Sequence, residues 1–159
     1  MLRDGREHHA RPYFMTSSLP PTERSLPIAL LRARDGVMAP IRKMLAETGI
    51  TEQQWRVLRV VSEHGPMDAS SLADQASLLY PSLTRISNSM REKGLLTQTR
   101  DKADRRRMIV AITSIGQSII DSNADQAAQI AADFKMTLGE EQYEQLLDLL
   151  ALLAPQTRS

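Results

Sequence analysis

Two short runs of strand-forming residues, LLTQT at 95–99 and MIVAIT at 108–113, stand in a chain whose other patterned segments have helical spacing. A charged stretch separates the two runs, which predicts a β-hairpin with Arg100–Arg107 as its loop. Three consecutive arginines, Arg105, Arg106 and Arg107, lie in that loop. The expected fold class is therefore mainly α with one small antiparallel β element.

Long helices are predicted on both sides of the hairpin. Residues 26–47 have apolar positions at helical spacing, and Pro40 inside them removes a hydrogen bond, so we expect the axis to bend near Ala39. Residues 113–136 and 139–153 have the same spacing. The last segment is apolar over too wide an arc for a helix that faces solvent, which is typical of an obligate dimer.

Three shorter helices are predicted between these long ones. Thr51 and Gln54 have the spacing of a capping box that opens the first, and Asp68 is a good N-cap for the second. Pro81 opens the third, and Gly94 ends it. Its apolar residues point to one side. The opposite face carries Ser82, Thr84, Arg85, Asn88 and Ser89.

The order of these elements is that of a winged helix-turn-helix. It consists of a short helix, a tight turn, a second helix with small polar residues and arginine on its open face, and a basic hairpin. In the major groove, Arg85 can pair with guanine and Asn88 with adenine. The arginines at 105–107 can reach the adjacent minor groove. Asp104, two residues before Arg106, is expected to hold that guanidinium in one rotamer and so to orient the wing.

The charge is unevenly distributed, although the chain as a whole carries only +1. Residues 82–107 hold eight Lys or Arg against three acidic residues, a net +5, whereas residues 113–159 hold two against seven, a net −5. The first segment suits a polyanion, which favours double-stranded DNA as the partner. Two alternatives are that the arginine run is merely a solvated charge cluster, or that the winged helix binds another protein.

Several other classes of protein are disfavoured. The chain has no cysteine, no glycine-rich phosphate loop and no ligand-spaced histidines, and His8-His9 lacks a third ligand, so we expect neither an enzyme nor a bound metal or cofactor. No apolar run reaches the ~18 residues of a membrane span, and the N-terminus lacks a secretory signal. A cytoplasmic location is expected. Residues 1–25 read as a flexible arm, within which Met15 is an alternative start.

The run PSLTRISNSMREKGLLTQTRDKADRRRMIVAITSIG, residues 81–116, resembles the recognition helix and wing of the MarR family of bacterial transcriptional regulators. Asp104-Arg105-Arg106 matches the family's Asp-x-Arg wing motif, and the resemblance extends over 26–153. TEQQWRVLR, residues 51–59, is similar to the subgroup that regulates homoprotocatechuate degradation operons. Pro40 and the N-terminal arm depart from that pattern.

The resemblance implies a homodimer that binds a pseudo-palindromic operator. Residues 26–47 and 114–153 would be its dimerisation helices, 51–113 its DNA-binding head and 154–159 a tail. The subgroup implies a repressor of a hydroxyphenylacetate or homoprotocatechuate catabolic operon, released by a phenolic acid. A MarR-type regulator of other genes, with a different ligand or none, is the alternative.

An effector of this kind needs a cation for its carboxylate and an aromatic or apolar wall for its ring. The matched helices offer Arg34, Met38, Trp55 and Arg56, of which Arg34 is the favoured cation. Each has a purely structural alternative, because Trp55 and Met38 suit a core and the two arginines suit salt bridges.

Overall fold

The computed structural model describes residues 21–154. Most of the expected arm therefore lies outside the described residues, as do His8-His9, Met15 and residues 155–159 of the expected tail. At the end of the arm, Thr22–Arg24 forms a short 3-10 helix, η1, which the sequence pattern did not predict.

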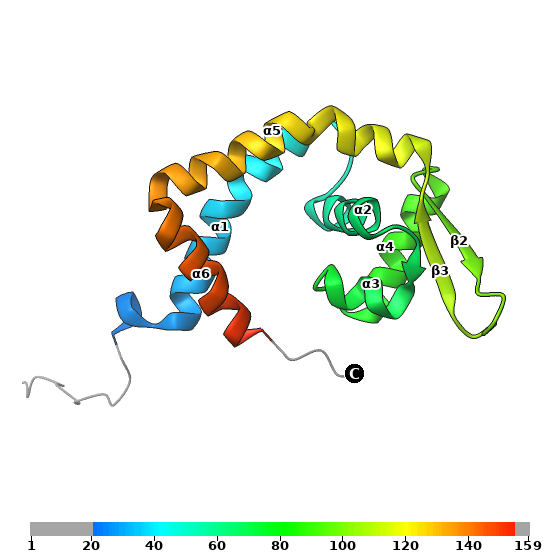
Figure 1. Cartoon of the computed structure of the whole chain (residues 1–159), viewed down its shortest axis with the longest axis horizontal. Coiled ribbons are helices and arrows are strands. Elements are labelled where there is room, and N and C mark those ends of the chain that lie inside the picture. Colours follow the sequence, from blue (N-terminus) through cyan, green and yellow to red (C-terminus); the bar gives the residue numbers. More distant parts are fainter. Residues whose placement is uncertain (1–20, 155–159) are drawn as a thin grey trace, which may run out of the picture. The chain divides into compact units, whose positions relative to one another are not determined.

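The described chain is mainly helical, with one three-stranded antiparallel sheet, which confirms the predicted fold class (Figure 1). After η1 the elements are α1 (Leu26–Leu45), α2 (Glu52–His64), β1 (Met67–Asp68), α3 (Ala69–Gln75), α4 (Tyr80–Glu92), β2 (Leu96–Arg100), β3 (Met108–Ile112), α5 (Ser114–Leu138) and α6 (Glu140–Leu153).

The chain divides into two compact units, one ending at Gly36 and one beginning at Val37. The division falls within α1, which is one continuous helix through Pro40. The bend expected near Ala39 stays a prediction. Helix η1 belongs to the first unit, and helices α2 to α6 and the sheet belong to the second.

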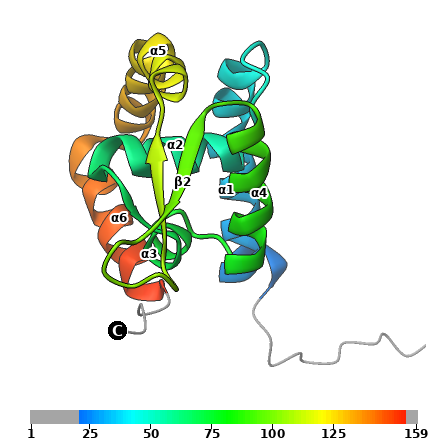
Figure 2. The same ribbon diagram turned by 90° about the vertical axis from the view of Figure 1, so that its right-hand side faces the viewer.

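The core of the second unit fixes α4, the helix with the polar open face. Leu83, Ile86 and Met90 are buried, as their spacing predicts, and α4 packs on α3 and beside β2 (Figure 2). They belong to one hydrophobic core with residues of α2, α3, β2 and β3 that are no more than 1% exposed: Val57, Leu58, Val61, Leu72, Leu96 and Val110. Because the inner face of α4 is anchored in this way, its outer face has a defined direction.

Both predicted N-caps are present. The Thr51 hydroxyl accepts from the Gln54 amide at 3.2 Å, and the Gln54 side chain accepts from the Thr51 amide at 3.1 Å, which is the predicted capping box. The Asp68 carboxylate accepts from the amides of Ser70 and Ser71, each at 3.1 Å. These two caps set where α2 and α3 begin.

Two details around the sheet differ from the sequence prediction. A third strand, β1, pairs with β3 through Met67 opposite Val110 and Asp68 opposite Ile109, giving the strand order β1-β3-β2. Helix α4 begins at Tyr80, one residue before the predicted Pro81, with Leu79 as an N-cap that makes no side-chain hydrogen bond. Strand β1 is only two residues long, too short for an alternating pattern to reveal it.

The start of α5 is fastened to the base of the hairpin. The Thr113 hydroxyl donates to the Gly94 carbonyl at 2.7 Å and accepts from the Gly116 amide at 3.1 Å. The Ser62 hydroxyl, near the C-terminal end of α2, donates to the Gln117 side chain at 2.9 Å and so links α2 to α5. Gly116 itself is buried, so α5 approaches the hairpin base closely.

Helix α6 buries none of its residues. Its exposed large hydrophobic side chains are all leucines, and Leu152, at 78%, is among the most exposed apolar residues of the described chain. Among residues 21–154, no helix combines the length and the apolar character that a membrane span requires.

Replacing Gly116 by alanine should lower the free energy of unfolding by about 2 to 4 kcal/mol, because the new Cβ has no space. It would collide with the Leu95 carbonyl oxygen and lie 2.9 Å from Cγ1 of Ile112 and 3.2 Å from Cδ2 of Leu58. Urea denaturation followed by circular dichroism measures the change. The control is Ser118→Ala, an exposed position in the same helix, where we expect less than about 0.5 kcal/mol. Equal stability of both variants would contradict the close contact at Gly116.

Candidate nucleic-acid interface

The outer face of α4 presents the residues that the sequence predicted for base contact. Thr84 and Arg85 are exposed, while Ser82, Asn88 and Ser89 are half-buried. The Thr84 hydroxyl donates to the Tyr80 carbonyl at 3.1 Å, so that donor is already used within the helix. Arg85 therefore carries the long, positively charged side chain of this face.

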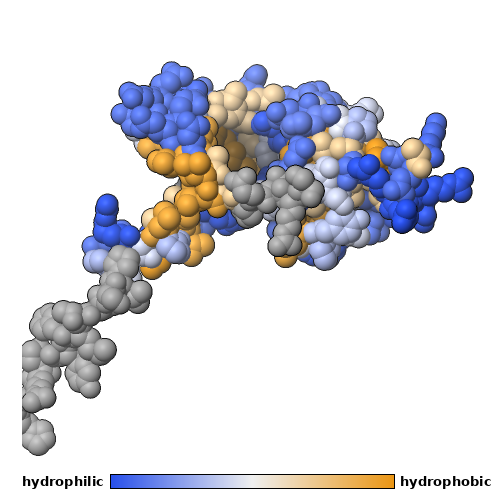
Figure 3. All heavy atoms as spheres, turned by 60° about the horizontal axis from the view of Figure 1, so that its bottom comes forward, coloured by the Kyte–Doolittle hydropathy of each residue, from blue (hydrophilic) through white to orange (hydrophobic). Residues whose placement is uncertain are grey.

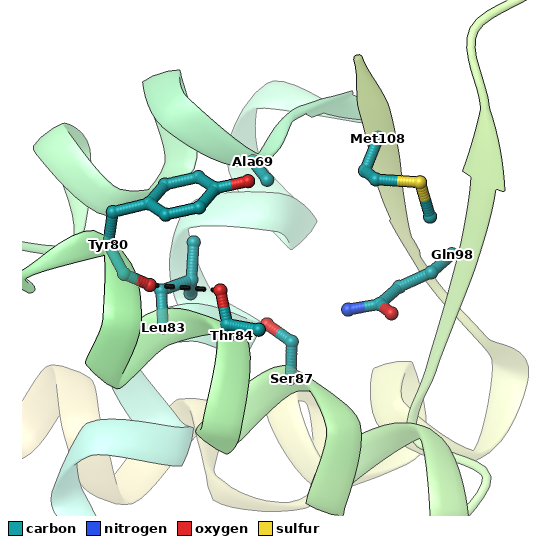
Figure 4. Close-up of a pocket in the computed structure, with 7 residues that line it drawn as sticks. All are labelled: Ala69, Tyr80, Leu83, Thr84, Ser87, Gln98 and Met108. Carbon is teal, nitrogen blue, oxygen red and sulfur yellow. Dashed lines mark hydrogen bonds between the residues drawn. The ribbon is translucent and has the colours of Figure 1, made fainter. Parts of the chain in front are cut away.

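A small cavity of about 60 Å³ is lined by residues of α3, α4 and the two hairpin strands (Figure 4). Ser87 lies at its edge, is 1% exposed, and has no hydrogen-bond partner for its hydroxyl among the described residues. The sequence did not predict that Ser87 would be buried. Close by, Arg91 of α4 donates to the Gln98 side chain of β2 at 3.3 Å, which links the helix directly to the hairpin. The lining residues are Ala69, Tyr80, Leu83, Thr84, Ser87, Gln98 and Met108.

Two aspartates shape the hairpin loop. Asp101 accepts from the Ala103 amide at 2.7 Å and the Asp104 amide at 3.3 Å, and these hydrogen bonds lower the pKa of its carboxyl. The Asp101 amide donates to the Arg107 carbonyl at 3.0 Å, and the Arg107 amide donates to the Asp104 carbonyl at 2.9 Å. The loop is thus an ordered turn, and the sequence analysis did not identify the part that Asp101 has in it.

The tip of this turn points its arginines outward. The Arg106 side chain is 95% exposed, and its Nε lies 3.5 Å from Oδ1 of Asp104. The same oxygen accepts from the Arg106 amide at 3.0 Å. Arg105 is also exposed, and the hairpin end of the molecule is strongly hydrophilic in Figure 3. Asp104 therefore lies beside the arginine that it was expected to orient.

Arg107, the third arginine, turns back toward the head. Its Nη2 lies 2.8 Å from Oδ2 of Asp68, the N-cap of α3, and its side chain is 54% exposed. Hydrogen bonds from the hydroxyl and amide of Ser71 lower the pKa of Asp68, and Arg107 lowers it further against the opposing effect of burial. The pair ties the hairpin to the start of α3. Sequence reasoning grouped Arg107 with the DNA contacts because its partner is 39 residues away.

A second hollow lies between α2 and α5, away from the hairpin. It is an open groove of about 350 Å³, walled by Trp55 of α2 and by Ile120 and small residues of α5, with one cation, Arg59. Among the four predicted effector residues, Trp55 lines this groove, whereas Met38 and Arg56 do not. Arg34 belongs to the other unit of the chain. The alanines of the α5 wall are Ala124, Ala127, Ala128 and Ala131.

Sequence reasoning missed Arg59, which is exposed one helical turn after Trp55. The spacing of i and i+4 puts these two side chains on one face of α2, and that signal could have favoured Arg59 over Arg56. Within residues 21–154, no three His, Asp or Glu side chains gather as possible metal ligands.

Comparisons with a family model, with related sequences and with solved structures all match transcriptional regulators. Residues 50–108 match the model of the MarR family. The chain is 35% identical over 130 residues to the HTH-type transcriptional regulator FarR of Neisseria gonorrhoeae, covering 82% of this chain and 89% of that protein. It is 34% identical over 126 residues to the homoprotocatechuate degradative operon repressor of Escherichia coli, covering 79% and 85%. The crystal structure of NadR in complex with 4-hydroxyphenylacetate superposes with a TM-score of 0.74 at 32% identity, covering 85% of this chain and 96% of that one.

The link between Asp68 and Arg107 can be tested through pH. Asparagine is also a good N-cap, so Asp68→Asn should keep α3 and lose only the charge interactions, lowering the free energy of unfolding by about 0.5 to 1 kcal/mol at pH 7. The pKa of Asp68 in the folded protein lies below its ordinary value of 3.8. The stabilising effect is therefore present above pH 3.8 and is lost as the pH falls through the lower folded value.

Thermal unfolding of the two proteins between pH 2 and 7 measures this difference. Arg107→Gln isolates the ion pair, because it leaves the Ser71 hydrogen bonds to Asp68 intact, so its pH-dependent difference from wild type should have the same direction and be smaller. A stability difference between wild type and Arg107→Gln that stays constant down to pH 2 would contradict the pairing.

Proposed function

This chain belongs to the MarR family, and from that premise we propose that it is a dimeric repressor that binds a pseudo-palindromic operator and is released by a phenolic acid. It would act in the cytoplasm without catalytic activity, as its relatives are transcriptional regulators. The observation that carries the proposal is that α4, with its open polar face, packs against β2 of the hairpin whose tip holds the arginines.

In the proposed complex, α4 enters the major groove, where Arg85 and Asn88 can hydrogen-bond to base edges. The short hydroxyl side chains of this face can bind bases or phosphates. Arg105 and Arg106 enter the neighbouring minor groove, where a narrow groove concentrates negative potential. Arg107 also contributes to DNA binding in this proposal, because its side chain is 54% exposed. Its ion pair with Asp68 supports a second role, which is to hold the hairpin at a fixed position relative to α3.

The proposed dimer places two such heads on successive turns of DNA. The leucines of α6 support it, because Leu149, Leu152 and Leu153 are each at least 58% exposed in the single chain. Covering such a surface with a second copy removes it from water, which is the usual basis of obligate dimers. We retain residues 26–47 and 114–153 as the dimerisation segments.

The proposed effector site is the groove between α2 and α5. Its volume lies within the ~300 to 1,000 Å³ of small-molecule sites, and its walls are apolar except for one cation. Arg59 would pair with the carboxylate of a phenylacetate-type ligand, and the Trp55 ring would pack against the ligand ring. Arg59 thus takes the carboxylate-binding role for which the sequence analysis favoured Arg34, while Arg34, Met38 and Arg56 stay predictions.

The homoprotocatechuate repressor of E. coli, at 34% identity, supports an aromatic catabolic operon as the regulated target. FarR, at 35% identity, is a transcriptional regulator whose name gives no ligand, and it is equally consistent with the alternative, a MarR-type regulator of other genes with a different ligand or none. The response to phenolic acids distinguishes these two functions.

Replacing Arg106 by alanine should weaken operator binding by roughly 1 to 3 kcal/mol, because it removes a charged contact in the minor groove. Fluorescence anisotropy on DNA from the region beside the gene measures the affinity, and analytical ultracentrifugation measures the dimer, which should be unchanged. Lys43→Ala, a basic and exposed residue of α1 outside the head, is the control and should change affinity by less than about 0.5 kcal/mol. Wild-type binding should also weaken steeply with added salt.

If Arg106→Ala instead dissociates the dimer, or if wild-type affinity does not depend on salt, the assignment of the hairpin to DNA is wrong.

Replacing Arg59 by alanine should raise the concentration of 4-hydroxyphenylacetate needed to release DNA by about 10- to 100-fold, the effect of one charged hydrogen-bonded pair. Affinity for DNA without the ligand should stay the same. Arg56→Ala is the matched control, since Arg56 lies on the same helix outside the groove.

The reverse pattern, in which only Arg56→Ala impairs release, would contradict the groove as the effector site. If neither 4-hydroxyphenylacetate nor 3,4-dihydroxyphenylacetate releases the wild type from DNA, the alternative function is favoured.

A further inference from the structure

Two exposed apolar side chains stand out in the head, residues 51–113, all of which the structure describes. They are Leu79, 77% exposed, and Tyr80, 50% exposed. They are the only large hydrophobic residues of this segment that are exposed, since the others in the described chain lie on α1, α5 and α6. The two are adjacent, and they stand where α4 begins.

The local structure does not account for a leucine at position 79. Leu79 is the N-cap of α4 and makes no side-chain hydrogen bond, although serine, threonine, aspartate or asparagine would stabilise that position by about 1 kcal/mol. Its side chain is not part of the core. The Tyr80 ring, by contrast, forms one wall of the small cavity beside α3, so part of it is used within the head (Figure 4).

The position is continuous with the proposed DNA surface. Leu79 precedes Arg85 on the element that would enter the major groove, and a helix-turn-helix presents the N-terminal residues of that helix to base edges. Among the groups that bases expose in the major groove, the C5-methyl group of thymine is the apolar one. An exposed leucine at this place therefore matches thymine and has no polar group with which to bind the other bases.

We propose that Leu79 contacts the C5-methyl group of one thymine in each operator half-site and is a specificity-determining residue. The inference rests on the proposed function and deepens it, because it names a base that the operator must contain opposite the start of α4. Burial of one methyl group corresponds to about a fourfold change in affinity for each half-site.

The test uses the full-length protein and an operator selected by it from a pool of randomised duplexes. Symmetric pairs of thymines are replaced by deoxyuridine, one pair at a time, which removes the methyl group and leaves base pairing intact. At one position the wild type should lose about fourfold in affinity per half-site, by anisotropy. Leu79→Ala should bind the thymine and deoxyuridine duplexes equally at that position and still discriminate at others.

Two further variants make the result specific. Leu79→Met keeps an apolar side chain and should keep the preference for thymine. Glu63→Ala removes an exposed side chain of α2, outside α4 and outside the proposed dimerisation segments, and should also keep it. Circular dichroism verifies that all variants are folded.

The outcomes separate the two proposals. If the wild type binds its operator but no thymine shows a methyl effect, or if Leu79→Ala shows the same effect as wild type, the Leu79 contact is refuted and the proposed function stands. If Leu79→Ala changes the oligomeric mass and not the discrimination between thymine and deoxyuridine, Leu79 contacts protein and the thymine contact is refuted. If the wild type selects no sequence and binds no DNA, both proposals fail.

Discussion

The carboxylate of Asp68 joins the three parts of the head. It caps α3, it accepts a hydrogen bond from the Ser71 hydroxyl at 2.7 Å, and it pairs with Arg107 at the end of the hairpin loop. Its backbone also belongs to β1, which pairs with β3. Because the start of α3, the sheet edge and the hairpin share this one residue, and α4 packs on α3, the face of α4 and the arginine tip have a defined spacing. DNA recognition by both at once requires such a spacing.

Local signals in the sequence predicted most of this fold. The capping box at Thr51, the N-cap at Asp68 and the buried side of α4 each depend on residues a few positions apart, which a sequence shows directly. The features that escaped prediction depend on distant segments. Strand β1 exists because β3 lies beside it, and Arg107 turns inward because of a carboxylate 39 residues earlier.

The groove that we propose as the effector site shows the same limit. Periodicity predicts which residues share a face of α2, but only the position of α5 determines which face is hollow, so the sequence alone did not indicate that Trp55 and Arg59 line one groove. Trp55 lines this groove at one end of α2, and Val57, Leu58 and Val61 of the same helix pack in the core that supports α4. A ligand between α2 and α5 would thus contact one element that is directly connected to the DNA-binding face and another that leads into α6.

The exposed leucines of α6 have a consequence for how operator occupancy depends on the concentration of this protein in the cell. If only the paired form holds an operator, the amount of active species at low abundance varies with the square of the amount of chain, by mass action. Halving the protein would then reduce the active form fourfold. The exposed leucines of α6 would in this way make the activity of the regulator depend steeply on its own synthesis, without any cooperative contact on the DNA.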